Sequence, residues 1–170
     1  NNLPNKLKEL CLSNNNITSI PSNLPESLKL LYLDDNKITF IPENLPNNLK
    51  ILFIGNNNIT LFPVNLPDKL EILYLEHNNI TLIPDNFPNN LITLNLDYNQ
   101  ITSFPNKFPN KLENLYLNHN KITSLSTDLV SLLPDSLQEL YLRDNQITSD
   151  FDLFELNLCK VCNKLRIFEY

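Results

Sequence analysis

The sequence predicts an α/β solenoid, a horseshoe in which short parallel strands form a sheet on the concave side and the chain returns behind them. Three observations predict this fold. One unit recurs at a constant interval along most of the chain, each copy contains two apolar residues separated by one other residue, and an asparagine follows that pair. The interval is about 21 residues, and a repeat of this length indicates a solenoid because a single unit cannot bury its apolar face alone.

The repeat unit reads L-P-x-x-L-x-x-L-x-L-x-x-N-x-I-T-x-h-P-x-N, where h is Ile or Phe. Its copies begin at Leu3, Leu24, Leu45, Leu66, Phe87 and Phe108, and an altered seventh copy begins at Leu133. The array therefore covers residues 1–148 as one domain. Residues 149–170 form either a C-terminal cap or the start of an eighth repeat, since 163–170 aligns with 5–12 of the first copy.

Each copy contributes one strand. In the second copy, Leu31 and Leu33 point into the core, while Leu30 and Tyr32 point away from it, because strand side chains alternate between the two faces. The other copies place equivalent inward pairs at Leu10/Leu12, Leu52/Ile54, Leu73/Leu75, Leu94/Leu96, Leu115/Leu117 and Leu140/Leu142.

The turn after each strand carries an asparagine, at Asn15, Asn36, Asn57, Asn78, Asn99, Asn120 and Asn145. A side-chain amide among buried leucines must be hydrogen-bonded, because leaving it unpaired costs several kcal/mol. We therefore expect a ladder of amides, each satisfying backbone groups of its own turn and of the neighbouring turn.

The returning segment of most copies contains Ile-Thr and then two prolines four positions apart, as in Pro42 and Pro46. Proline fixes φ, removes an amide donor and biases the preceding residue toward extended geometry. The convex side should therefore be mostly polyproline-like or irregular.

The sixth copy departs from this pattern, because the step from Phe108 to Leu133 is longer than the steps between the earlier copies. Ser126 or Thr127 can cap a short helix there. Helical spacing would turn Leu129, Leu132 and Leu133 toward the core. We expect this insertion to adjust the length of the convex side.

The overall charge excludes some classes of ligand. A net charge of −6 and a pI near 4.8 argue against nucleic acid, which requires a basic surface. A helix that crosses a bilayer needs about 20 consecutive apolar residues. The sequence contains no apolar run of such length, so we expect no segment to span a membrane.

The cysteines favour an intracellular, cytoplasmic location over secretion. An odd and low count forms no disulfide framework and indicates a reducing compartment; the three are Cys11, Cys159 and Cys162. N-I-T glycosylation sequons also occur, but the repeat itself generates them by placing Asn before Ile-Thr; they are Asn16, Asn58 and Asn79.

No pattern in the sequence indicates catalysis, a cofactor or a metal. Cys159 and Cys162 supply only two of the four ligands that zinc requires. His77 and His119 occupy the same repeat position two strands apart, so about 10 Å separates their backbones. No nucleophile, base and orienting acid converge. The sequence predicts a protein that is not an enzyme.

The variable outward positions predict a protein-binding surface. In copies two to four they form an apolar block of Leu30, Tyr32, Ile51, Phe53, Ile72 and Tyr74, and Tyr116 extends the aromatic row. An acidic flank contains Asp34, Asp35, Glu76 and Asp97, with the single glycine, Gly55, opening a notch between Asp34 and Glu76. The opposite flank contains Lys8, Lys29 and Lys50. An apolar centre with a charged rim is typical of protein-binding sites.

A second interpretation is that the aromatic residues only support strand pairing through cross-strand contacts. It accounts for the tyrosines, but not for Leu30, Ile51 and Ile72 beside them. We therefore favour binding.

The unit L-P-x-x-L-x-x-L-x-L-x-x-N-x-I-T-x-I-P resembles the short bacterial-type leucine-rich repeats of secreted effector proteins, including the repeat domains of novel-type effector ubiquitin ligases. It is also similar to Asn- and Ile-rich arrays encoded by giant DNA viruses and by protists with AT-rich genomes. The resemblance covers Leu3 to about Thr148. It implies the leucine-rich-repeat fold, and a host-cell location for an effector or viral protein, but says little about function.

Three functional hypotheses follow. The first is a non-enzymatic module that binds an unknown protein or peptide on its concave sheet. The second is the substrate-recognition part of a ubiquitin ligase or similar effector whose catalytic domain is not in this chain. The third is self-association through the uncapped ends of the solenoid, because an unpaired edge strand can pair with another chain.

Overall fold

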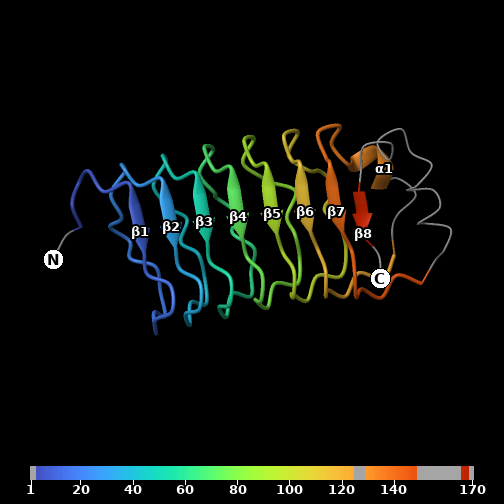
Figure 1. Cartoon of the computed structure of the whole chain (residues 1–170), viewed down its shortest axis with the longest axis horizontal. Helices are drawn as coiled ribbons and strands as arrows, with labels where there is room; N and C mark the ends of the chain where they lie inside the picture. The colour runs from blue at the N-terminus through green and yellow to red at the C-terminus, as the bar shows by residue number, and fades with distance from the viewer. Residues whose placement is uncertain (1–2, 125–128, 149–165, 169–170) are drawn as a thin grey trace.

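The computed structural model describes residues 3–124, 129–148 and 166–168, which form one parallel sheet backed by returning segments (Figure 1). In these residues the sheet has eight strands in sequence order, from β1 to β8. They are β1 Glu9–Cys11, β2 Leu30–Tyr32, β3 Ile51–Phe53, β4 Ile72–Tyr74, β5 Thr93–Asn95, β6 Asn114–Tyr116, β7 Glu139–Tyr141 and β8 Arg166–Phe168. The solenoid that the sequence predicts is confirmed.

Strand pairing follows the repeat. Leu31 in β2 lies opposite Leu52 in β3, and Leu52 lies opposite Leu73 in β4. Each of these steps is one full repeat along the sequence. Any slip by a single position would turn the leucines out of the core, so the alternating pattern and the constant period together determine the register.

The core is a continuous column between the sheet and the returning segments. The middle leucine of β2, β3, β4, β5, β6 and β7 is fully buried in every case. From the returning side, Ile38, Ile59, Ile80, Ile101 and Ile122 are also fully buried. Burying each of these side chains contributes about 1.5–3 kcal/mol, and most of that contribution requires the neighbouring repeats to be present.

The asparagine ladder joins consecutive repeats. Asn57 accepts a hydrogen bond at Oδ1 from the backbone N–H of Ile38, at 2.9 Å. Its Nδ2 donates to the carbonyl of Leu33 in the preceding repeat at 3.0 Å, and to the carbonyls of Ile54 and Gly55 in its own turn. The expected amide ladder is therefore confirmed, and each interior asparagine closes two turns at once.

The returning side is irregular. Its one helix in the described residues is α1, Leu129–Leu132, within the lengthened sixth repeat. Leu129 and Leu133 are buried, and the Leu133 N–H donates to the Leu129 carbonyl at 3.0 Å. Leu132 is half-buried. The expected cap residues Ser126 and Thr127 lie outside the described residues.

The two ends of the sheet differ. β1 pairs only with β2 in the described part of the chain. β8 pairs with β7, placing Ile167 opposite Leu140, as the alignment of 163–170 with the first copy suggests. A cap formed by 149–165 lies outside the described residues. No helix among the residues that the structure describes is long and apolar enough to cross a membrane.

Candidate protein-binding face

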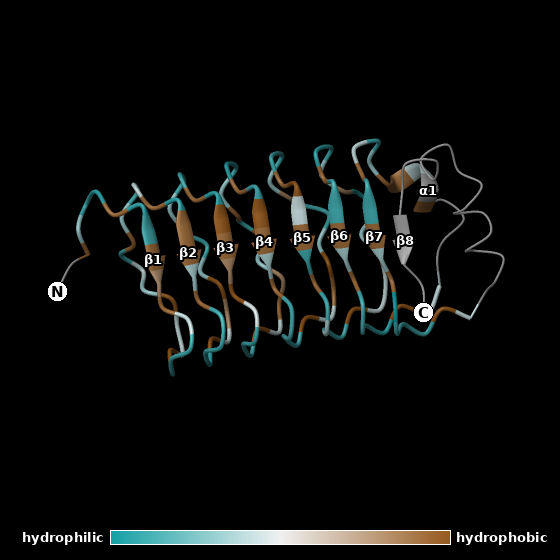
Figure 2. Ribbon diagram, in the orientation of Figure 1, coloured by the Kyte–Doolittle hydropathy of each residue, from teal (hydrophilic) through white to brown (hydrophobic). Residues whose placement is uncertain are grey.

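The outward residues of β2, β3 and β4 form the apolar block, which consists of Leu30, Tyr32, Ile51, Phe53, Ile72 and Tyr74. All six side chains are half-buried, while the leucine between each pair is fully buried. On neighbouring strands the same positions carry polar residues, such as Glu9, Thr93, Asn114 and Glu139. Figure 2 shows this contrast as brown strands β2–β4 between the more hydrophilic strands β1 and β6.

Phe53 lies at the centre of the aromatic row. Its ring meets Tyr32 edge-on at a centroid distance of 5.2 Å and stacks on Tyr74 at 4.6 Å. Tyr116 stacks instead on Tyr141 at 4.7 Å, and Asn95 of β5 separates it from Tyr74. The structure thus brings together the six residues of the apolar block and leaves Tyr116 in a separate pair.

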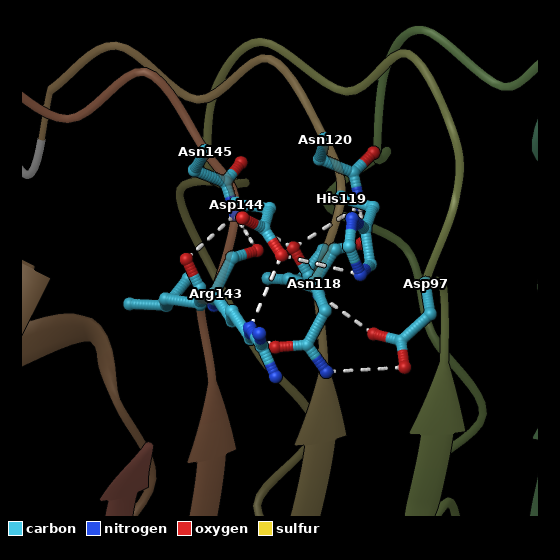
Figure 3. Close-up of polar contacts among 9 residues, drawn as sticks. Asp97, Asn118, His119, Asn120, Arg143, Asp144 and Asn145 are labelled. Atoms are coloured by element: carbon cyan, nitrogen blue, oxygen red, sulfur yellow. Dashed lines mark hydrogen bonds and ion pairs between the residues drawn. The ribbon is translucent and has the colours of Figure 1, made fainter. Parts of the chain in front are cut away.

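The acidic flank follows the carboxyl ends of the strands. Asp34 accepts from the Gly55 N–H at 2.9 Å, and Asp97 accepts from the Asn118 N–H at 2.6 Å. Asn118 Nδ2 also donates to the second oxygen of Asp97, as Figure 3 shows. Each of these aspartates therefore caps the backbone of the following repeat, which holds its carboxylate at the edge of the sheet.

Glu76 occupies the same repeat position but lies differently. Its carboxylate lies over Gly55 in the preceding repeat: a Cβ added to Gly55 would stand 2.6 Å from Glu76 Oε1. Glu76 Oε2 is buried and has no hydrogen-bond partner among the described residues. The single glycine of the chain therefore makes room for a carboxylate that is only partly satisfied.

Burial raises the pKa of the Asp34, Glu76 and Asp97 carboxyl groups on this flank. For Glu76 burial is the largest cause, and repulsion from Asp34, Asp97 and Asp35 raises the pKa further. For Asp34 and Asp97 burial also dominates, while their hydrogen bonds to neighbouring repeats act in the opposite direction. The flank holds negative charge in a place where that charge is unfavourable.

We expect Glu76→Gln to raise the thermal midpoint at pH 7. A carboxyl whose pKa is higher in the folded state binds its proton more tightly there, so its ionisation destabilises the fold above that pKa. This cost disappears below the pKa of the unfolded chain, at about 4. Circular-dichroism melts should show the variant and wild-type midpoints converging as the pH falls toward that value.

Asp68→Asn is the matched control, because Asp68 is an exposed carboxylate on the loop before β4. It should show no such pH-dependent gain. A lower midpoint for Glu76→Gln at pH 7 would mean that the Glu76 carboxylate stabilises the fold.

The basic flank follows the amino ends of the strands. Lys50 Nζ pairs with Glu71 Oε1 at 2.5 Å, which neutralises that position. Lys8 and Lys29 are exposed on the neighbouring repeats. Charge therefore changes sign along the strand direction, from positive at the amino ends of β1 and β2 to negative at the carboxyl ends of β2 to β5.

A second apolar row lies on the returning side, and the alternation of the strands does not predict it. Phe40, Leu61 and Leu82 are 56%, 76% and 64% exposed. The equivalent residues in other copies are Ser19, Ser103 and Ser124. Comparing the position after each Ile-Thr would have revealed this row, which occupies the same three repeats as the apolar block.

His77 and His119 are joined by an aromatic residue at the edge of the sheet. Both stack on Tyr98, which lies between them, with ring centroids 4.1 and 4.0 Å apart. All three residues have positive φ, between 52° and 55°, a conformation that costs about 1–2 kcal/mol for a residue with a Cβ. Ring stacking offsets part of that cost.

Within the described residues, no group of three or more His, Cys, Asp or Glu side chains is arranged to hold a metal ion. Cys11 is a free, exposed thiol. Cys159 and Cys162 lie outside the described residues.

A parallel solenoid tied by an asparagine ladder, with an apolar block on its strands, defines a repeat scaffold. The leucine-rich-repeat model matches residues 6–26, 27–47, 69–90 and 136–159, and a model of two leucine-rich repeats matches 89–131. The chain belongs to the leucine-rich-repeat family, whose members are generally non-catalytic binding scaffolds.

Solved structures of bacterial proteins are similar to the chain. YopM from Yersinia enterocolitica is 27% identical with a TM-score of 0.78, over 99% of this chain and 34% of that one. The leucine-rich-repeat domain of a Shigella effector is 31% identical with a TM-score of 0.71, over 97% of this chain and 82% of that one.

An internalin from Listeria monocytogenes is 27% identical with a TM-score of 0.72, over 95% of this chain and 47% of that one. The chain thus spans about a third of the length of YopM and about half that of the internalin. No curated protein sequence matches it.

Proposed function

We propose that this chain is a non-enzymatic interaction module that binds a protein or peptide through the apolar block. The observation that carries the proposal is the contiguity of six half-buried apolar side chains on three adjacent strands. The first outward position of β1, β5, β6 and β7 is polar instead. Contiguous exposed apolar surface marks interaction sites in soluble proteins. Asp34, Glu76 and Asp97 provide its polar rim.

The aromatic residues are suited to act as the energetic centre. Phe53 is held on both sides by Tyr32 and Tyr74, so its ring loses little conformational freedom on binding. Aromatic residues near the middle of an interface commonly contribute most of the binding energy. The aliphatic residues Leu30, Ile51 and Ile72 lie beside them and would exclude water from the contact.

We expect the triple variant Tyr32→Ala, Phe53→Ala and Tyr74→Ala to lose its partner while keeping its fold. Truncating a binding hot spot costs about 2 kcal/mol or more for each residue, which suffices to remove a micromolar interaction. A pull-down from cell extract, with circular dichroism to confirm folding, compares this variant with the wild type.

The control is Phe40→Ser, Leu61→Ser and Leu82→Ser, which removes three exposed apolar side chains from the other side of the same repeats. Serine occupies these positions in copies one, five and six. Retention of the partner by the serine variant and its loss by the alanine variant support the proposal. The opposite pattern would transfer the binding site to the returning side.

A second candidate is the recognition part of a larger effector. It is favoured by the similarity to the leucine-rich-repeat domain of a Shigella effector, of which this chain covers 82%. A reading frame that continues past Tyr170 into a cysteine-containing domain would support this role, and a stop codon there would remove it.

A further inference from the structure

We propose that the segment bound on the apolar block carries a lysine or arginine whose cationic group pairs with the Glu76 carboxylate beside Gly55. This inference rests on the proposed function and narrows it, because it specifies the partner as an apolar segment with a cation at a defined place.

Glu76 lies beside the aromatic centre of the apolar block. Gly55 follows Phe53 by two positions, and Glu76 follows Tyr74 by two positions. The Glu76 carboxylate lies over Gly55, next to the two stacked rings. A partner whose apolar side chains cover Phe53 therefore has its next residues within reach of this carboxylate.

Glu76 differs from the neighbouring aspartates in having an unsatisfied acceptor. Asp34 and Asp97 direct their oxygens at N–H groups of the following repeats, whereas Glu76 Oε2 is buried without a hydrogen-bond partner in the described residues. Leaving a charged acceptor unpaired is costly, and an N–H donor on a cation is the strongest partner for it. The oxygen is enclosed, so the flexible end of the Glu76 side chain must turn outward when the cation binds.

The charges around Glu76 favour a cationic partner. The charged groups that act most strongly on Glu76 are Asp34, Asp97 and Asp35, and all three are acidic. The exposed Lys8 and Lys29 lie at the opposite ends of the strands. A bound segment is therefore oriented with its cation toward the carboxyl ends of β2–β5. The flank and the net charge of −6 attract such a segment and repel an acidic one.

The experiment is selection from a random peptide library displayed on phage. The targets are the wild type, Glu76→Gln, Gly55→Ala, the charge-matched control Asp68→Asn, and the triple alanine variant of Tyr32, Phe53 and Tyr74. Gly55→Ala leaves every charge in place but moves the Glu76 carboxylate, because the added Cβ would overlap its flexible end. Circular dichroism establishes that each target is folded.

We expect peptides selected on the wild type and on Asp68→Asn to combine aromatic or aliphatic residues with a Lys or Arg at fixed spacing. Titration calorimetry with one selected peptide should show binding about tenfold to a hundredfold weaker for Glu76→Gln and for Gly55→Ala, the range for a hydrogen bond to a charged group. Replacing the cation of the peptide by Gln should have the same effect on the wild type and little effect on Glu76→Gln.

Selected peptides that lack a cation, or that bind the wild type and Glu76→Gln equally well, would overturn this inference and leave the proposed function in place. An equal effect of Asp68→Asn and Glu76→Gln would also overturn it, because general electrostatic attraction would then explain the preference. No enrichment on the wild type over the triple alanine variant would remove the proposed function and this inference together.

Discussion

Asn78→Ala is expected to lower the free energy of unfolding by about 2–4 kcal/mol. Asn78 Oδ1 accepts from the Ile59 N–H at 2.9 Å, and its Nδ2 donates to the carbonyls of Ile54 and Leu75, each at 3.1 Å. Both carbonyls keep a second donor, from Asn57 and Asn99. The buried Ile59 N–H loses its acceptor, and a cavity opens beside it. Urea denaturation followed by circular dichroism measures the loss.

The control is Asn15→Ala, at the first position of the ladder. Asn15 is exposed, and its Nδ2 donates only within its own turn, to the carbonyls of Leu12 and Ser13. Its loss should therefore cost less than about 1 kcal/mol. Equal losses for the two variants would contradict the view that the amide stabilises the fold by joining two repeats.

A second substitution at Asn78 separates the acceptor of the amide from its donor. Asn78→Asp keeps the acceptor for Ile59 but replaces the donor by an oxygen that faces the carbonyls of Ile54 and Leu75. We expect it to destabilise the protein at least as much as alanine does at pH 7, because a buried charge then meets only acceptors on that side. Both halves of the amide are needed, and no other side chain of that size supplies them.

The fold could be predicted because repetition supplies the same information several times. Leu31, Leu52 and Leu73 occupy one repeat position, so an inward face assigned in one copy is checked by the others. The constant period then determines both the strand order and the register, which the structure confirms. The period fails in the lengthened sixth repeat, between β6 and β7, and again between β7 and β8. In the sixth repeat, helical spacing after a capping residue predicts the short helix α1.

The site could be predicted only in part. The residues of the apolar block follow from alternation, but the contacts among them depend on side-chain conformations that a pattern does not contain. Tyr116 is an example, because Asn95 separates it from Tyr74 and it stacks on Tyr141 instead. Glu76 is another: its position equals that of Asp34, yet one extra methylene and the open space over Gly55 turn it toward the preceding repeat.

Tyr98 shows that backbone conformation also limits what the sequence predicts about the site. Its backbone has positive φ because every residue before a ladder asparagine does, and this requirement of the turn is invisible in a hydropathy pattern. That conformation directs neighbouring side chains along the edge in parallel, so His77 and His119 reach the same ring. Residue spacing predicted the distance between the two histidines but not the residue that joins them.

Leu73→Ala is expected to cost about 2–5 kcal/mol, as large-to-small changes in packed cores do. Leu73 is the fully buried middle residue of β4, and it lies opposite Leu52 and Leu94 on the adjacent strands. The cavity therefore weakens the contacts of one repeat with both neighbours. Urea denaturation of the variant and the wild type gives the change in unfolding free energy.

Because Leu73 lies in the middle of the array, its replacement should also change how cooperatively the protein unfolds. A solenoid is stabilised by contacts between nearest neighbours, so a defect in the middle weakens the link between the two halves, whereas a defect at the end removes one terminal contact. Leu10→Ala in β1, where the leucine is half-buried, should therefore cost less and leave the denaturant slope unchanged. Leu73→Ala should also reduce that slope, because the halves begin to unfold separately. Equal costs with identical slopes would show that the repeats unfold as one unit regardless of where the core is weakened.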